Sequence, residues 1–374
     1  MTQVASEGTA SIPSRSFARR VFAAQESGLV LVIILLMAAL TIFGGTKVKR
    51  VIGEDGEVTK ISVNRFLDVE NLVLLAKDAS FIAIMAVGMT AVIVLGGIDL
   101  SVGSIYALAA LLGAMALRAL QSRWLHLPAD VSVPSEGGAP LWVALLVGLG
   151  VCCSVGAAAG AANGSLIVGL RVHPFIITLG TMAAFRGVVF VTTGGLSITG
   201  IPDSFSSKFF KAEMWGVYPV PLLVMLAVMV AGHLVLTRLV VGRHMFAIGG
   251  NETAASYAGI PVGRVKIIVH TLCGLLAGLS ASVYLGYYAA FEPNAGNGYE
   301  LSVIAATVIG GASLSGGRGS ALGAVLGAVL IQLITNAMII LNIDSSYTNI
   351  VMGGAIVVAV VMDQTKSRMS ARRA

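Results

Sequence analysis

Charged residues are scarce in this sequence. Asp, Glu, Lys and Arg make up 11% of its 374 residues, whereas hydrophobic residues make up 56%. A soluble domain usually contains about 25% charged residues, so these few charges cannot cover a surface that faces water. Because lipid needs no such cover, the composition predicts an integral membrane protein. The 45 glycines agree, since glycine is more frequent in membrane helices than in soluble ones.

The sequence also lacks the patterns of catalytic and metal sites. Its three cysteines, Cys152, Cys153 and Cys273, lie in apolar segments without metal-ligand spacing, and we interpret them as packing residues. The five histidines are scattered, and no H-E-x-x-H motif is present. The dipeptide Gly-Lys, which a phosphate-binding P-loop needs, does not occur. We therefore predict no catalytic residue, no metal site and no ATP hydrolysis by this chain.

Long apolar stretches predict the fold. A membrane-spanning helix needs about 20 apolar residues, and ten stretches meet or approach this length: 27–45, 71–97, 98–117, 141–169, 173–193, 217–237, 267–290, 300–314, 320–341 and 348–363. Two of them, 173–193 and 300–314, are short or interrupted by glycine, which also suits half-helices. The prediction is an all-α, polytopic transmembrane helix bundle of about ten spans, including broken or re-entrant segments. This transmembrane domain covers 27–363, between tails at 1–26 and 364–374.

The positive charges predict the orientation of the bundle. The net charge is +6, which in a soluble protein would suggest nucleic acid, but in a membrane protein Lys and Arg mark cytoplasmic loops. Basic residues recur in alternate segments, with few acids beside them, when the N-terminus is placed inside. We therefore predict cytoplasmic termini, a cytoplasmic loop at 238–266, and periplasmic loops at 46–70 and 118–140. No nucleic-acid partner is predicted.

The predicted periplasmic loops differ in character. Residues 46–70 hold Val58, Ile61 and Val63 in an alternating pattern beside a Gly-Glu-Asp-Gly turn at 53–56, which indicates a small hairpin. Residues 118–140 contain three prolines and several glycines, and are predicted to form a loop.

An internal repeat lies at two breaks between apolar stretches. LGGIDLSVG at 95–103 aligns with IGGASLSGG at 309–317, and each copy ends one predicted span and begins another. The two copies are predicted to point the same way across the membrane. Glycine-interrupted helices within internal repeats are typical of transporters, where the breaks lie near the pathway.

Glycines spaced by four residues predict close helix packing. Such ladders occur at Gly156, Gly160 and Gly164, at Gly274 and Gly278, and at Gly319, Gly323 and Gly327. Four residues place the glycines on one helix face, where another helix can approach closely.

Two ionisable residues inside predicted spans or breaks are candidates for a functional role. Asp99, in GGIDLSVGS, either lines a water-filled path or, with Ser101, caps the helix that starts near Val102. Arg186 either pairs inside the bundle or extends to an interface. Asn163, within a long span, is expected to hydrogen-bond between helices.

The cytoplasmic loop 238–266 contains one predicted short helix. Gly249 and Gly250 are expected to break the chain, Asn251 to cap the helix, and Gly259 and Pro261 to end it. Ala254, Ala255 and Ala258 are expected to be exposed. With no lipid to face, this helix suits docking into a groove of another protein.

Four segments together resemble a known family. They are GGIDLSVGS at 96–104, HPFIITLGTMAAFRG at 173–187, AIGGNETAASYAGI at 247–260 and VIGGASLSGGRGS at 308–320. In this order they are similar to the permease subunits of bacterial ABC importers for monosaccharides of the ribose, xylose and arabinose type. The resemblance spans roughly 71–363.

The resemblance implies a multi-pass protein of the bacterial inner membrane, surrounded by lipid and working as a permease homodimer. It implies a cytoplasmic ABC ATPase that binds ATP and Mg, with no cofactor in this chain, and a periplasmic sugar-binding protein. It places ATPase coupling on Asn251, Glu252, Ala254, Ala255 and Gly259. It places the translocation path near four residues of the first repeat: Gly97, Asp99, Ser101 and Gly103.

Two other classes of function stay open on sequence grounds. An ion-coupled secondary transporter would use Asp99 to bind a proton or cation, although the spans are poor in acidic residues. A membrane enzyme or structural scaffold would need residues that the sequence does not offer. The loops 46–70 and 118–140 are longer than the compact members of the family have, and their role is open.

Overall fold

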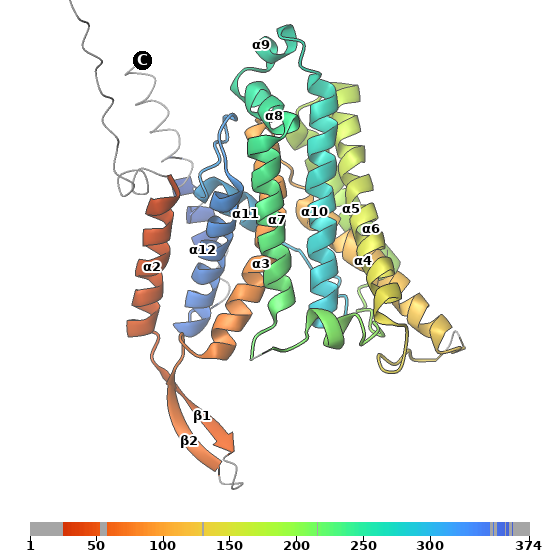
Figure 1. Cartoon of the computed structure of the whole chain (residues 1–374), viewed down its shortest axis with the longest axis vertical. Coiled ribbons are helices and arrows are strands. Elements are labelled where there is room, and N and C mark those ends of the chain that lie inside the picture. The colour runs from red at the N-terminus through yellow and green to blue at the C-terminus, as the bar shows by residue number, and fades with distance from the viewer. Residues whose placement is uncertain are drawn as a thin grey trace, which may run out of the picture.

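The structure of the chain is a computed structural model that describes residues 25–52, 58–128, 131–214, 216–344, 347, 350–355, 357, 358 and 361. Most of the predicted tails at 1–26 and 364–374 therefore lies outside the described residues. Within them the chain folds into a bundle of helices with one β-hairpin at its end (Figure 1). The elements are α2 (Gln25–Phe43), β1 (Thr46–Ile52), β2 (Val58–Asn64), α3 (Val69–Val94), α4 (Val102–Trp124), α5 (Leu141–Leu170), α6 (Pro174–Thr193), the π-helix η1 (Ser206–Phe210), α7 (Pro219–Arg238), α8 (Val240–Gly250), α9 (Glu252–Tyr257), α10 (Val262–Tyr288), α11 (Tyr299–Ile309) and α12 (Ala321–Ile340).

The helical membrane bundle predicted from apolar stretches is confirmed. Eight described helices are long and apolar enough to cross a bilayer, and α11 is a shorter apolar helix. Each of the first nine predicted stretches overlaps one of these nine helices. The tenth, 348–363, is helical at each of its described positions, and its other residues lie outside the described part.

Two details of the predicted spans are corrected. The segment 173–193 is not a half-helix, because α6 is one helix of 20 residues. The predicted loop 118–140 begins later than expected, because α4 continues to Trp124. Arg118 and Arg123 lie on its exposed side while Gln121 is fully buried, so the charges do not interrupt the helix. The Gln121 amide donates to the carbonyl oxygens of Pro134 and Ser135 at 3.0 and 3.1 Å and so holds the following loop.

Burial separates an inner set of helices from an outer set. In the most apolar windows of α3, α4, α10 and α12, between 56% and 67% of residues are buried, against 11% to 22% in α2, α5, α6 and α7. The outer helices are equally apolar in composition, so their exposed faces suit lipid rather than water. The bundle therefore has a protein core along α3, α4 and α10.

The glycine ladders predicted to pack helices do so. A Cβ atom on Gly156 would lie 2.2 Å from the carbonyl oxygen of Gly274, and one on Gly274 would lie 2.2 Å from that of Gly156. Gly310 and Gly323 form a similar contact between the end of α11 and α12. At these crossings the two backbones touch, and only glycine leaves room for the approach.

The two ends of the bundle differ in charge. The hairpin lies at one end and α9 at the opposite end (Figure 1). Basic residues that the charge pattern assigned to the cytoplasm lie at helix ends or loops on the α9 side: Arg171, Arg238, Arg243, Arg264, Lys266 and Arg318. We therefore name the α9 end the cytoplasmic end and the hairpin end the periplasmic end.

The predicted hairpin is confirmed. Strands β1 and β2 pair antiparallel from Thr46 opposite Asn64 to Ile52 opposite Val58, and the turn at 53–56 lies outside the described residues. Asp68, at the start of α3, forms ion pairs with Lys47 and Lys49 of β1. Arg65 donates to the carbonyl oxygen of Ile340 at 3.0 Å. The hairpin is thus tied to α3 and α12.

The ion pairs between Asp68 and the hairpin predict that the stability of the folded chain depends on pH. The hydrogen bond from Lys47, with the charges of Lys47 and Lys49, holds the pKa of Asp68 below its usual 3.8. A lowered pKa stabilises the folded state above the unfolded pKa, and this stabilisation is lost as pH falls through the folded pKa. We expect Lys47→Gln to lower the melting temperature in detergent at pH 7 by about 1 to 3 °C. The difference from wild type should shrink below pH 4; a constant difference at all pH values would contradict the role of this pair.

Candidate functional site

The two copies of the glycine-rich repeat meet at the cytoplasmic end. The Gly317 N–H of the second copy donates to the carbonyl oxygen of Val94, which immediately precedes the first copy, at 2.9 Å. Gly249 of α8 packs into the same place, where a Cβ atom would lie 1.8 Å from the Val94 oxygen. Both copies therefore turn at one end of the bundle, as predicted, and they share a contact with the 238–266 segment.

Asp99 belongs to a buried polar network. Its Oδ1 accepts hydrogen bonds from the Ser101 N–H at 2.8 Å and from the Ser101 hydroxyl at 2.6 Å. The Asn163 amide of α5 donates to the Ser101 hydroxyl at 2.7 Å, which confirms the predicted interhelical bond. Ser101 occupies the N-cap position of α4, but its side chain accepts no helix N–H. Asp99 thus closes the turn before α4 and does not cap the helix.

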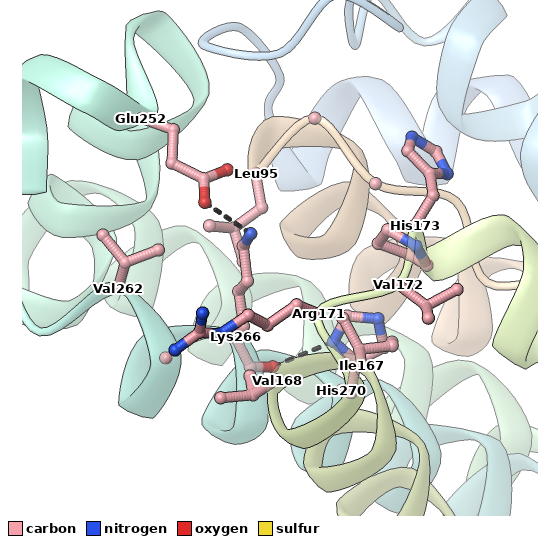
Figure 2. A pocket seen from close by; sticks show the side chains of 14 residues that line it. Leu95, Ile167, Val168, Arg171, Val172, His173, Glu252, Val262, Lys266 and His270 are labelled. Atoms are coloured by element: carbon pink, nitrogen blue, oxygen red, sulfur yellow. Dashed lines mark hydrogen bonds and ion pairs between the residues drawn. The ribbon is translucent and has the colours of Figure 1, made fainter.

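A cavity opens beside this network at the cytoplasmic end. Its volume is about 570 Å³, and its walls come from the first repeat, the α5–α6 turn, α9 and the start of α10. Figure 2 shows the side chains of Arg171 and Lys266 extending into it, with His270 at their base. The Lys266 ammonium is 2.7 Å from the Glu252 carboxylate. Cations, an acid and a histidine therefore line one hollow between apolar walls.

The cavity brings together parts of both predicted groups of site residues. Gly97, predicted near the translocation path, and Glu252, predicted in the coupling helix, both line it. Asp99 and Ser101 are completely buried and do not line it. Gly103 lies elsewhere, where a Cβ atom would meet the Gly296 carbonyl and the Glu300 carboxylate.

In the predicted coupling segment the helix cap is confirmed, whereas the number of helices is corrected. The Asn251 side chain accepts the Ala254 N–H at 2.9 Å and caps α9, as predicted. The 238–266 loop contains two helices, α8 and α9, rather than one. Ala254 is exposed as predicted, but Ala255 is buried, because it faces the rest of the bundle.

The tip of this segment exposes an aromatic ring that sequence reasoning missed. Tyr257, the last residue of α9, is 89% exposed. Since α9 projects beyond the ends of the long helices (Figure 1), this ring lies where another protein can contact it. Aromatic residues are enriched at protein interfaces.

Arg186 lies inside the bundle and not at an interface. It is the thirteenth residue of α6, about 18 Å along the helix from its start. Its guanidinium donates to the carbonyl oxygens of Ala295 at 2.8 Å, Pro293 at 3.4 Å and Gly103 at 3.4 Å. It therefore joins α6 to the start of α4 and to the loop before α11, through backbone acceptors.

A second buried charge, Lys77, was missed. Lys77 of α3 is 3% exposed, pairs with Asp78 at 2.8 Å and donates to the Tyr288 hydroxyl at 2.7 Å. Its ammonium also lies 4.6 Å from the ring centroid of Tyr287, within the range of a cation–π contact. The signal was present, because Lys77 and Asp78 interrupt the predicted span 71–97.

Comparison with known proteins gives a consistent result. The family model described as "Branched-chain amino acid transport system / permease component" matches residues 71–360. The ribose import permease protein RbsC of Escherichia coli K12 is 38% identical over 312 residues, which are 83% of this chain and 90% of that protein. RbsC of Bacillus subtilis 168 is 37% identical over 302 residues, covering 81% and 87% of the two chains.

A relative with another named substrate is almost as similar. The D-allose transport system permease protein AlsC of Escherichia coli K12 is 36% identical over 308 residues, covering 82% of this chain and 87% of that protein. No solved structure gives a significant match. The family model covers the glycine-rich repeats, the cavity and the coupling segment, so the chain belongs to this family of transport-system permease components.

Proposed function

We propose that the chain is the permease subunit of an ABC importer for a monosaccharide or similar small polyol. The family description names branched-chain amino acids, but RbsC and AlsC, which are 38% and 36% identical over most of the chain, are named for ribose and allose. The lining of the cavity supports a sugar, because a histidine, a lysine, an arginine and a carboxylate suit hydroxyl groups.

The geometry of α9 is the observation that supports an external ATPase. This helix projects at the cytoplasmic end, is capped by Asn251 and is held to α10 by the Glu252–Lys266 ion pair. It also lies against the cavity that the first repeat borders. A movement of α9 driven by a cytoplasmic ATPase that hydrolyses ATP with Mg would therefore reach the cavity directly.

The remaining partners follow from the same proposal. The permease would work as a homodimer in the inner membrane, and a periplasmic binding protein would deliver the sugar to the hairpin end. The proposed translocation path runs near Gly97, Asp99, Ser101 and Gly103. The proposed coupling residues are Asn251, Glu252, Ala254, Ala255 and Gly259, of which the buried Ala255 would support the helix from beneath.

The ion-coupled alternative is not favoured. The relatives bear the names of import permeases, one of them of a probable ABC transporter. Within this chain, one carboxylate oxygen of Asp99 is already occupied by two hydrogen bonds from Ser101. A coupling cation would have to compete with this local turn.

Deletion and purification test the proposal together. We expect cells without the chain to lose uptake of one sugar from a panel of D-ribose, D-allose, D-xylose and L-arabinose. We also expect the tagged chain, extracted in mild detergent, to co-purify with an ABC ATPase. Uptake that resists depletion of the proton gradient but not of ATP would separate this mechanism from an ion-coupled carrier. Normal uptake of all four sugars after deletion, with no ATPase bound, would contradict the proposal.

A further inference from the structure

Three buried polar atoms beside the cavity have no hydrogen-bond partner among the described residues. They are Oδ2 of Asp99, Oδ1 of Asn163 and Nε2 of His270. Asp99 and Asn163 are 0% exposed and His270 is 2% exposed. Buried polar atoms are nearly always hydrogen-bonded, so each unpaired one calls for an explanation. A ligand or water that donates to them supplies one.

Two of the three atoms belong to one hydrogen-bonded group, because Asp99 and Asn163 are joined through the Ser101 hydroxyl. The third, on His270, belongs to the neighbouring helix α10. Asn163 precedes Gly164, whose Cβ position would lie 3.3 Å from the Cβ of His270, so His270 packs against the turn of α5 that carries Asn163. Of the three residues, His270 lines the cavity.

All three atoms are hydrogen-bond acceptors. The Nδ1 of His270 lies 2.8 Å from the backbone carbonyl oxygen of Lys266. Because a carbonyl oxygen can only accept, Nδ1 bears the hydrogen, and Nε2 of the neutral ring is left as an acceptor. The carboxylate oxygen of Asp99 accepts as well, and so does the amide oxygen of Asn163. A ligand that pairs with all three atoms must therefore supply several hydrogen-bond donors.

The rim of the cavity carries hydrogen-bond donors, in contrast to these three acceptor atoms. Arg171 extends across it (Figure 2) and forms no ion pair within the described part of the chain, while Lys266 is paired with Glu252. A metal cation would be repelled by these charges at the entrance, and an anion would be repelled by Asp99 behind the floor. A neutral polyol matches both the basic rim and the acceptor atoms, since each hydroxyl donates one hydrogen bond and accepts others.

We propose that His270, Asn163 and Asp99 form a binding site for sugar hydroxyl groups at the cytoplasmic end of the path, with Arg171 at its rim. The site deepens the proposed function and rests on it. It adds three side chains, from α5, α10 and the α5–α6 turn, to the predicted path residues. A sugar leaving the bundle would exchange hydrogen bonds here before it enters water.

Substitution of His270 tests the site by its kinetics. The protein is tested as the complete transporter in proteoliposomes, with whichever of D-ribose, D-allose, D-xylose and L-arabinose the wild type transports. We expect His270→Leu to lower the maximal uptake rate about tenfold, because a donor hydroxyl loses its acceptor. The half-saturating concentration should change less than about twofold, because capture of external sugar lies elsewhere. His270→Gln, whose amide oxygen can take the place of Nε2, should restore uptake to within about threefold of wild type.

A matched control is the neighbouring Thr271→Val. The Thr271 hydroxyl is bonded within its own helix to the Ile267 carbonyl at 2.8 Å, so we expect wild-type uptake. Full uptake by His270→Leu would overturn the site while leaving the permease function intact. Absence of transport by the wild type with all four sugars of the panel would instead count against the proposed function.

Chemical protection tests the site independently of any effect on folding. Arg171 is exposed, so Arg171→Cys, in a chain with its three native cysteines replaced by alanine, should fold. We expect high millimolar sugar to slow modification of this cysteine by a charged thiol reagent in inside-out vesicles. Arg243→Cys on α8, which does not line the cavity, should react equally fast with and without sugar. Equal reaction rates at Arg171→Cys would overturn the proposal.

Discussion

Replacement of Gly156 by leucine is expected to remove nearly all folded protein from the membrane. At this position α5 crosses α10, and a Cβ atom would lie 2.2 Å from the Gly274 carbonyl oxygen and 2.9 Å from the Gly278 nitrogen. Both neighbours are backbone atoms, so no side-chain rotation relieves the overlap. The helices would have to separate along the ladder that Gly156, Gly160, Gly274 and Gly278 form.

The size of the expected loss of folded protein follows from how tightly α5 and α10 pack at this crossing. Overpacking of a well-packed core costs about 1–3 kcal/mol for small additions, and leucine adds four carbon atoms against a rigid backbone. The same crossing also fixes His270, because a Cβ atom on Gly160 would meet the His270 carbonyl oxygen at 2.1 Å. The amount of detergent-extracted protein in the monodisperse peak of size-exclusion chromatography measures the loss.

The matched control lies on the same helix. Gly150 of α5 is exposed, and a Cβ atom there would meet nothing within 4 Å. We expect Gly150→Leu to give a wild-type yield, because its side chain would face lipid. Equal yields for the two variants would show that α5 and α10 are not packed as closely as the structure has them.

The fold was largely predictable because the bilayer imposes a length and a composition on each span. Apolar stretches located nine helices, and glycines four residues apart identified the faces that pack. The error at 118–124 arose where a helix continues past the apolar stretch, supported by the buried Gln121. The break at Gly249 and Gly250 is predicted correctly, because α8 ends at Gly250. The helix before the break is missed, although its buried residues Gly242, Met245 and Ile248 follow a helical spacing.

The site was predictable only in parts. The repeat identified both breaks, and the loop pattern identified Asn251 as a cap, because these are local signals. Nothing local shows that Gly97 borders one cavity with Glu252 and His270, since it lies more than 150 residues before both of them. His270 has no motif around it, and its open Nε2 becomes visible only when its other nitrogen is seen bonded to Lys266. Geometry of this kind depends on the packing of α5 on α10.

Replacement of Gly259 by valine is expected to abolish sugar uptake while the protein still inserts and folds. Gly259 has a φ of +82°, which β-branched residues avoid, and nothing lies within 4 Å of its Cβ position. It ends α9 in a Schellman arrangement, in which the Ile260 N–H donates to the Ala255 carbonyl and the Gly259 N–H to the Ser256 carbonyl. The strain of about 1–2 kcal/mol therefore falls on the end of α9 and not on the membrane core.

The consequence for transport depends on whether α9 couples the chain to an ATPase. If it does, a distorted end of α9 should lower uptake at least about tenfold, since 1.4 kcal/mol is already a factor of ten. The extracted protein should keep its wild-type chromatographic profile. Gly250→Val, at the end of α8, offers a control, because its Cβ position is also open and its φ is not positive. Wild-type uptake by Gly259→Val would show that the shape of this turn is not what transmits ATP hydrolysis to the cavity, and the coupling residues would have to be sought on α8 or at the exposed Tyr257.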